Sequence, residues 1–306
     1  MTIETIAEEF SSLKEKGYVS VAKDRDSQPL NMYYEIHGSG IEKVVLVMGL
    51  STPCQAWEHQ CKYLAETGKY TVIIFDNRGV GNSDSPSGLY ATSQMAKDAF
   101  DLLDHFGWTS GIHLVGISMG GMIALEMATT EPERLKTLTL TSTCARKLIP
   151  TVRAVTSLAR SAFILKTIEE RVDSMVSLVY PPTWLEQTCT EDESYPTNRH
   201  MVKARVQRRS TKTRIQPLHG NIGQTAACLR HYVSDARLTQ FRKTGIPTMI
   251  ITGTWDYLVR PDYSYQMHKV LDCRLEVFEG GGHGLIEEQK EKYNALLAEH
   301  FSQTSQ

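Results

Sequence analysis

Short apolar runs alternate with amphipathic segments along most of the 306-residue chain. Runs of about four to eight apolar residues bounded by turn residues are typical of buried strands, whereas apolar positions spaced three and four apart predict helices. The pattern predicts strands near residues 18–22, 30–37, 43–48, 71–76, 111–116, 135–141, 246–252 and 274–278. It predicts helices near residues 2–16, 56–67, 92–106, 119–130, 261–271 and 285–301.

Because strands and helices alternate, we expect an α/β fold with one doubly wound, mostly parallel, eight-stranded sheet flanked by helices. Between about residues 145 and 235 the strand pattern disappears, and segments of helical character broken by prolines replace it. The chain is therefore expected to form a single domain, residues 1–306. Its core would comprise residues 1–144 and 236–306, with a helical insertion at about 145–235.

The most informative motif is Gly-Ile-Ser-Met-Gly at residues 116–120, which stands between an apolar strand and a helix rich in glycine and methionine. This strand–turn–helix setting is typical of a nucleophile elbow, with Ser118 at its tip. So sharp a turn strains the serine backbone and crowds the positions two residues away, where glycine relieves the crowding. Serine is also a common helix N-cap, so the motif alone leaves a structural role open.

Two further candidates follow Ser118 in chain order. Asp256 comes directly after the predicted strand 246–252, and His283 follows three glycines after the strand 274–278. Serine, aspartate and histidine in this order, each after a strand, are the arrangement of elbow hydrolases. In such a site His283 is the general base for the serine, and Asp256 fixes its tautomer. Each residue alone has an ordinary structural interpretation; their shared placement favours catalysis.

These motifs resemble those of α/β-hydrolase-fold proteins, and the similarity covers nearly all of the chain except its middle. The segment 75–84, Phe-Asp-Asn-Arg-Gly-Val-Gly-Asn-Ser-Asp, is similar to the D-x-R-G-x-G-x-S loop of that family. We interpret this loop as structural, with Asp76 and Arg78 pairing locally. The resemblance implies that the insertion is a lid. Because the elbow carries serine, the aspartate-dependent epoxide hydrolases and haloalkane dehalogenases of this fold are excluded.

One loop departs from the family pattern. Many members carry His-Gly after the third strand, where this chain has Met-Gly-Leu-Ser at residues 48–51. The loop offers a backbone N–H to the developing oxyanion, together with the residue after the nucleophile. Alignment with the motif implies Leu50 and Met119 as the two donors. Backbone donors need no histidine side chain, so we still expect an oxyanion hole.

Composition and charge limit the classes of partner and cofactor that we expect for this chain. A formal net charge of −2 favours neither nucleic acid nor anionic membranes, and we expect the basic run at residues 199–214 to be a solvated helix face. No apolar run is long enough to span a bilayer. The six cysteines lack metal-ligand spacing, and the N-terminal segment lacks a signal-peptide core. We therefore expect a cytoplasmic protein with no metal or organic cofactor; its oligomeric state stays open.

The resemblance implies a serine esterase that cleaves a small to medium, mainly apolar carboxylic ester or lactone through an acyl-enzyme. The same triad supports thioester cleavage, C–C bond hydrolysis and cofactor-free perhydrolysis, and a slow-turnover small-molecule receptor is a further alternative. Apolar residues of the insertion either face the substrate pocket or bury the insertion against the core. These residues are Met175, Leu178, Val179, Trp184 and Leu185.

Overall fold

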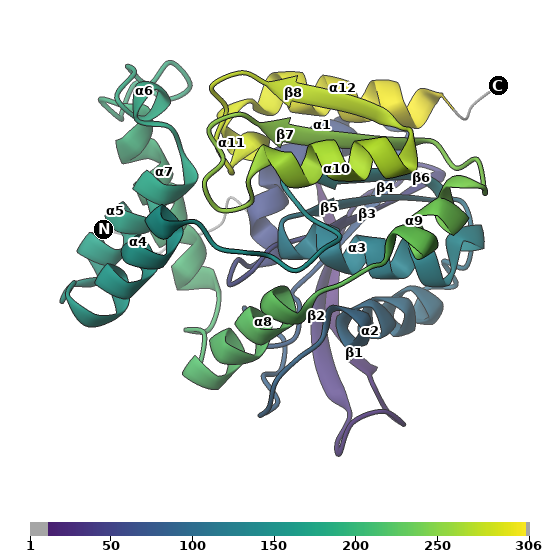
Figure 1. Ribbon diagram of the computed structural model, residues 1–306. Helices are drawn as coiled ribbons and strands as arrows, with labels where there is room; N and C mark the ends of the chain where they lie inside the picture. Colours follow the sequence, from purple (N-terminus) through teal and green to yellow (C-terminus); the bar gives the residue numbers. More distant parts are fainter. Residues whose placement is uncertain (1–11, 304–306) are drawn as a thin grey trace.

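The computed structural model describes residues 12–303, apart from the side chains of residues 158, 159 and 161–163. One eight-stranded sheet runs through the molecule in the order β1-β2-β4-β3-β5-β6-β7-β8 (Figure 1). Its strands are β1 (Leu13–Val21), β2 (Leu30–Gly38), β3 (Glu42–Val47), β4 (Tyr70–Phe75), β5 (Ile112–Ile117), β6 (Leu135–Thr141), β7 (Thr248–Gly253) and β8 (Arg274–Phe278). β2 pairs antiparallel with β1 and β4, and the other neighbours are parallel. The predicted fold class is confirmed.

Helices connect the strands. They are α1 (Glu58–Glu66), α2 (Thr92–His105), α3 (Met119–Thr130), α4 (Val152–Phe163), α5 (Ile168–Val179), α6 (Pro182–Leu185), α7 (Asn198–Lys212), α8 (Leu218–Arg230), α9 (Asp235–Arg242), α10 (Pro261–Leu271), α11 (Leu285–Glu288) and α12 (Lys290–Ser302). Short 3-10 turns stand at Cys54–Trp57 and Pro132–Arg134. No helix in the described part of the chain combines the length and apolar character that crossing a bilayer requires.

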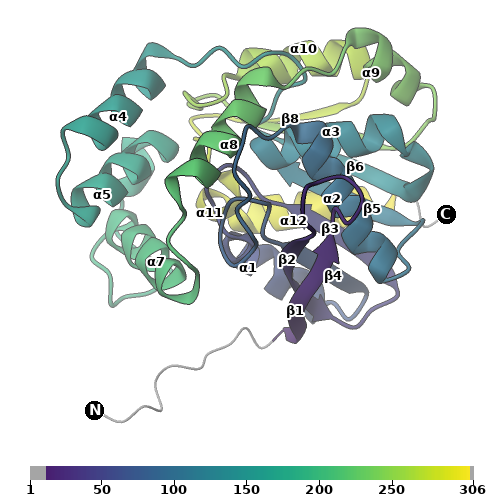
Figure 2. The same cartoon turned by 90° about the horizontal axis from the view of Figure 1, so that it is seen from below.

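The helices form a layer on each face of the sheet. α2, α3, α9 and α10 cover one face, and α1 and α12 cover the other (Figures 1 and 2). Every residue of β5 and of β7 is buried, as expected for parallel strands covered on both faces. On the α1 and α12 side, Trp57 lies 6.5 Å from Tyr293 between ring centroids. The central strands are therefore packed on both faces along their whole length.

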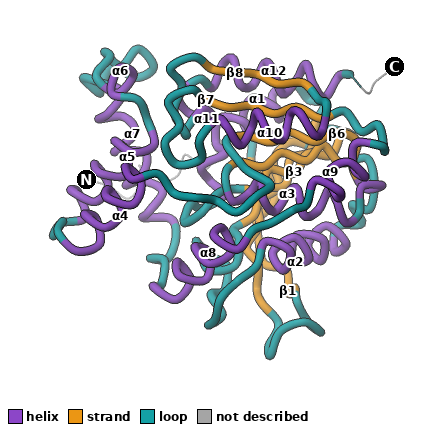
Figure 3. Tube along the Cα trace, viewed as in Figure 1, coloured by secondary structure: helices purple, strands orange, loops and turns teal. Residues whose placement is uncertain are grey.

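The insertion, the helices α4 to α8 that follow β6, contains no named strand among its described residues (Figure 3). It has an apolar cluster of its own, built around Val176, Leu185 and Met201. Of the apolar residues singled out in the sequence, Val179, Trp184 and Leu185 belong to this cluster, Leu178 is buried, and Met175 is 50% exposed. Most of them therefore pack within the protein.

Two sequence-based expectations need correction. Residues 2–11 of the expected helix 2–16 lie outside the described residues, and residues 13–16 belong to β1, where Lys16 stands opposite Glu35 of β2. Pairing with β2 outweighs the helix-like charge pattern, because at a sheet edge the polar side chains stay exposed. The expected helix 285–301 is interrupted at Gln289, whose φ of −126° and ψ of 36° separate α11 from α12.

Candidate active site

Ser118 stands in the turn between β5 and α3, with φ of 57° and ψ of −124°. This is a strained conformation for a residue with a side chain, and it persists only where the surroundings enforce it. The Ser118 N–H donates to Thr141 O at 2.9 Å, and Ser118 O accepts from Thr143 Oγ1 at 2.7 Å. Both partners come from β6 or the residues just after it. The neighbouring strand therefore holds the turn in place.

The glycines of the motif are needed for close backbone approach. A Cβ on Gly116 would lie 2.4 Å from Gly120 O, and a Cβ on Gly120 would lie 2.0 Å from Val47 O. Neither contact is possible for a real side chain. The crowding inferred from the motif is thus present in the structure, and it packs the start of α3 directly against the end of β3.

The loop after β3 lies beside the serine. A Cβ on Gly49 would stand 3.1 Å from Ser118 Cβ and 3.6 Å from Ser118 Oγ. The N–H groups of Leu50 and Met119 make no hydrogen bond with any residue in the range 12–303. For Met119 this is expected, since the first N–H groups of a helix have no partner within the helix.

Asp256 and His283 are in direct contact. The Asp256 Oδ2 atom lies 2.7 Å from His283 Nδ1. The other carboxylate oxygen accepts hydrogen bonds from the backbone N–H groups of Leu258 and Val259, each at 2.9 Å. Asp256 is buried, and the His283 side chain is only 12% exposed. A carboxylate fixed in this way sets the orientation of the ring and places the proton on Nδ1, which leaves Nε2 as an acceptor.

Cross-strand hydrogen bonds join the strand ends that carry these residues. The Ser118 N–H donates to Thr141 at the end of β6, Ser142 N–H donates to Ile251 O of β7, and Thr254 N–H donates to Phe278 O of β8. The segments bearing Ser118, Asp256 and His283 therefore meet at one edge of the sheet. Among the described residues, Ser118 Oγ makes no hydrogen bond to the His283 ring; such bonds commonly tighten only when substrate binds.

The loop that carries His283 is held from two sides. The backbone N–H of His283 donates to Val179 O, at the end of α5, with a distance of 2.8 Å. The preceding residue, Gly282, donates its N–H to Glu288 Oε2 at 2.9 Å. Burial raises the pKa of Glu288 to about 7, and the Gly282 N–H partly opposes that rise. No sequence signal distinguished Glu288 from its acidic neighbours, so sequence reasoning missed this contact.

The expected pairing of Asp76 with Arg78 is wrong. Arg78 binds Asp98 of α2 through two nitrogens, at 2.6 and 2.8 Å, and Asp26 at 2.8 Å. Asp76 instead accepts the N–H groups of Cys54, at 2.7 Å, and Asn82, at 2.8 Å. Burial raises the pKa of Asp76 to about 6. The partners of Arg78 lie 20 and 52 positions away in sequence. A prediction made from the loop sequence alone therefore paired Arg78 with Asp76.

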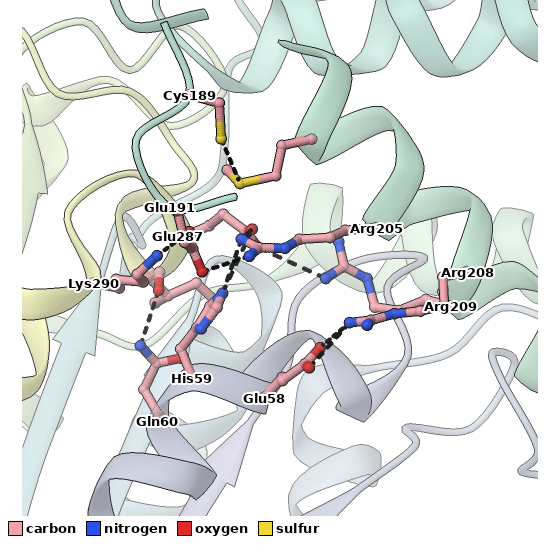
Figure 4. A network of polar contacts seen from close by, with 12 residues as sticks. Glu58, His59, Gln60, Cys189, Glu191, Arg205, Arg208, Arg209, Glu287 and Lys290 are labelled. Atoms are coloured by element: carbon pink, nitrogen blue, oxygen red, sulfur yellow. Dashed lines mark hydrogen bonds and ion pairs between the residues drawn. The ribbon is translucent and has the colours of Figure 1, made fainter. Parts of the chain in front are cut away.

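The basic run is also not a simple solvated face. Arg205 of α7 donates to Glu287 of α11 and to Glu191, each at 2.5 Å, and Arg208 donates to Glu58 of α1 at 2.7 Å (Figure 4). Burial alone would raise the pKa of Glu287, but hydrogen bonding to His59 and the nearby guanidinium charges hold it well below its usual range. The pairs with Glu287 and Glu58 join the insertion to the core, whereas Glu191 belongs to the insertion itself. Glu287 stands four residues past His283.

In the range 12–303, no three His, Cys, Asp or Glu side chains are grouped so that they could hold a metal ion.

Comparison with known proteins agrees with this architecture. A model of the alpha/beta hydrolase fold matches residues 42–290. RutD of Azorhizobium caulinodans, a protein classed by inference as a carbamate hydrolase, is 25% identical over 271 residues, covering 87% of this chain and 93% of RutD.

Solved structures show the same fold. A thermophilic esterase from Thermogutta terrifontis superposes with a TM-score of 0.74 at 22% identity, covering 95% of this chain and 99% of the esterase. The enol-lactonase from Burkholderia xenovorans LB400 gives a TM-score of 0.74 at 18% identity, covering 94% of this chain and all (100%) of that one. At these identities the likeness concerns the fold alone.

Proposed function

Since the chain belongs to the alpha/beta hydrolase fold family, we propose that it is a serine hydrolase in which Ser118, His283 and Asp256 form a catalytic triad. The observation that carries the proposal is the 2.7 Å contact between Asp256 and His283, made at the sheet edge where Ser118 occupies its strained turn. A buried carboxylate, an oriented imidazole and a serine at an elbow support this proposal, because acyl transfer by a serine hydrolase uses these three groups.

In the proposed mechanism, Ser118 Oγ attacks the substrate carbonyl carbon while His283 Nε2 takes the hydroxyl proton. The carbonyl electron pair moves onto oxygen, where the N–H groups of Leu50 and Met119 stabilise it. The tetrahedral intermediate collapses, the bond to the leaving oxygen breaks, and His283 gives its proton to the departing alcohol. Water, activated by the same histidine, then attacks the acyl-enzyme and releases the acid and Ser118.

We propose a small to medium, mainly apolar carboxylic ester or lactone as substrate. The support is the family, together with an acyl-transfer site whose donors are backbone groups that do not select a charged substituent. Because RutD carries the name of a carbamate hydrolase, a carbamate belongs among the compounds to test. Thioester cleavage, C–C bond hydrolysis and perhydrolysis are the alternatives that use the same three residues.

The insertion at about residues 145–235 is proposed to be the lid of this single-domain enzyme. Its helix α5 ends against the loop of His283, and Arg205 of α7 binds Glu287. A lid in this position shapes the pocket and limits access of water to the reacting groups. All six cysteines are free thiols, in keeping with the cytoplasmic location expected from the sequence.

A substrate panel tests the proposal. Purified protein and the Ser118→Ala variant are assayed with matched esters, lactones, carbamates, thioesters and vinylogous diketones of graded chain length. Turnover of an ester or lactone that is lost in the variant supports the proposed reaction. Turnover confined to another compound class assigns the triad to that chemistry. Ligand-dependent thermal stabilisation without any turnover would favour a receptor instead.

A further inference from the structure

We propose that Gln224 of the insertion is a positioning residue for the oxyanion hole. This inference rests on the proposed function. Gln224 lies in α8 and is completely buried. Its Oε1 accepts the backbone N–H of Ser51 at 2.8 Å, and Ser51 directly follows the proposed donor Leu50. The same oxygen also accepts Gln216 Nε2 at 3.3 Å, and the bond to Ser51 spans 173 positions of sequence between the insertion and the loop after β3.

The Ser51 backbone needs such support. Its φ of 55° is in the left-handed region, which residues with a side chain seldom adopt. The Ser51 N–H belongs to the peptide that follows Leu50, so holding this N–H fixes the ψ angle of Leu50. A rotation there would turn the Leu50 N–H away from the oxygen that it is proposed to bind. Asn221, also on α8, adds a 2.8 Å bond from its amide to Ser51 Oγ.

The amide of Gln224 is itself held in one orientation. Its Nε2 donates to Arg78 O at 2.8 Å, and the Arg78 guanidinium is fixed by Asp98 and Asp26. With Nε2 committed to a carbonyl, Oε1 must face Ser51. Gln224 thus connects the loop at residues 75–84 to the loop after β3, and the insertion completes that connection.

Two other contacts hold the remainder of the loop after β3. The Asn77 amide donates to Met48 O at 2.9 Å, and Asp76 accepts the Cys54 N–H. Both anchors come from the core and act on the ends of the loop. Gln224 acts at its centre, next to the proposed donor, where the Thr52 hydroxyl also donates to Leu50 O at 3.0 Å. Loss of Gln224 should therefore loosen the oxyanion donor and leave the loop attached.

The experiment compares Gln224→Leu, which removes the hydrogen bonds to Ser51, Arg78 and Gln216, with Gln224→Glu, which keeps an acceptor for Ser51. Arg214→Met is the matched control, because Arg214 also joins the insertion to the core, through Asn82 O and Ser83 O, without touching the loop after β3. Each protein is assayed for kcat and KM on the best ester, and for the affinity of two inhibitors. One is a trifluoromethyl ketone, which forms an oxyanion with the serine; the other is the carboxylate product.

We expect Gln224→Leu to lower kcat and the affinity of the ketone by roughly tenfold to a hundredfold, less than the loss of a direct donor. KM and the affinity of the carboxylate should change by less than about threefold, Gln224→Glu should lie between Gln224→Leu and wild type, and Arg214→Met should match wild type. A merely structural residue would weaken both inhibitors alike. Equal weakening, or a ketone affinity within about threefold of wild type, overturns the inference.

If Gln224→Leu does not fold, Asn221→Ala gives the same comparison, since the Asn221 side chain is only half-buried and its loss opens no core cavity. A smaller decrease in ketone affinity, without a decrease in carboxylate affinity, is then expected. An unchanged ketone affinity contradicts the proposal. The ketone also separates the two claims. A wild-type protein that does not react with it at Ser118 overturns the proposed function, whereas reaction that is insensitive to Gln224 overturns only the role of Gln224.

Discussion

The backbone N–H of His283 donates a 2.8 Å hydrogen bond to the carbonyl oxygen of Val179, the last residue of α5. The insertion therefore touches the proposed general base directly. Gly282, the residue before His283, also lies against this part of the insertion. A Cβ on Gly282 would stand 2.5 Å from Val179 O and 2.8 Å from Pro181 Cδ. The close approach of α5 to the loop of His283 depends on a glycine at 282.

Replacing Gly282 by alanine should push the end of α5 away from this loop. We expect a decrease in kcat of about tenfold or more, because small displacements of a catalytic group are costly. Gly281→Ala is the control for a crowded glycine in the same loop, since its Cβ would meet Leu285 Cδ2 at 2.7 Å and Phe278 Cβ and O at 3.0 and 3.1 Å, all of them in the core. The kcat for ester hydrolysis is compared between the two variants, once their Tm values have been shown to be equal. Equal activities would show that contact with α5 does not position His283.

Asp256→Asn should lower kcat by about 10⁴-fold while the fold is retained. The asparagine oxygen would accept the N–H groups of Leu258 and Val259, which leaves its NH₂ facing His283 Nδ1. The ring must then carry its proton on Nε2 and cannot accept one from Ser118. Asp262→Asn, an exposed position on α10, should be fully active. An Asp256→Asn enzyme with more than a tenth of wild-type kcat would contradict the assigned role.

Glu288→Gln should make stability less sensitive to pH. The pKa of Glu288 is raised by burial from 4.5 to about 7, so between these values the folded protein holds a proton that the unfolded chain has released. Stability of the wild type therefore falls as pH rises through this range. Glutamine does not titrate, and it can still accept the Gly282 N–H. The Tm of the variant relative to wild type should increase between pH 5 and pH 8.

Glu287→Gln is the natural comparison, because the adjacent carboxylate has its pKa held well below 4.5. Its ionised form stabilises the folded state above that value, so the variant should lose Tm relative to wild type at neutral pH and approach it in acid. Parallel pH profiles for the two variants would contradict both assignments.

Local patterns were enough to predict much of this molecule. Glycines and strand ends identified Ser118, Asp256 and His283 as candidates, and the direct contact of the latter two agrees with that grouping. Buried strands such as β5 and β7 are recognisable because both of their faces are apolar.

What failed was pairing over long distances. Residues 13–16 look helical in isolation, and only the partner strand β2 makes them a strand. Arg78 finds Asp98 twenty positions away, and Gln224 finds Ser51 at a separation of 173. Such contacts depend on the tertiary fold, which brings distant segments of the chain together, and a local sequence pattern carries no information about it. The ion pair of Arg205 with Glu287, 82 positions apart, was missed for the same reason. Glu288 binds Gly282 only six positions away, and it was missed because nothing in the sequence separates it from its acidic neighbours.

The central claim is that Ser118 carries an activated hydroxyl. The protein is treated with a fluorophosphonate at neutral pH and digested, and the modified peptide is identified by mass spectrometry, with Ser118→Ala and Asp256→Asn treated in parallel. The account predicts stoichiometric modification of Ser118 in the wild type, none in Ser118→Ala, and much slower modification in Asp256→Asn. An unmodified Ser118 in folded, ester-hydrolysing protein would contradict it.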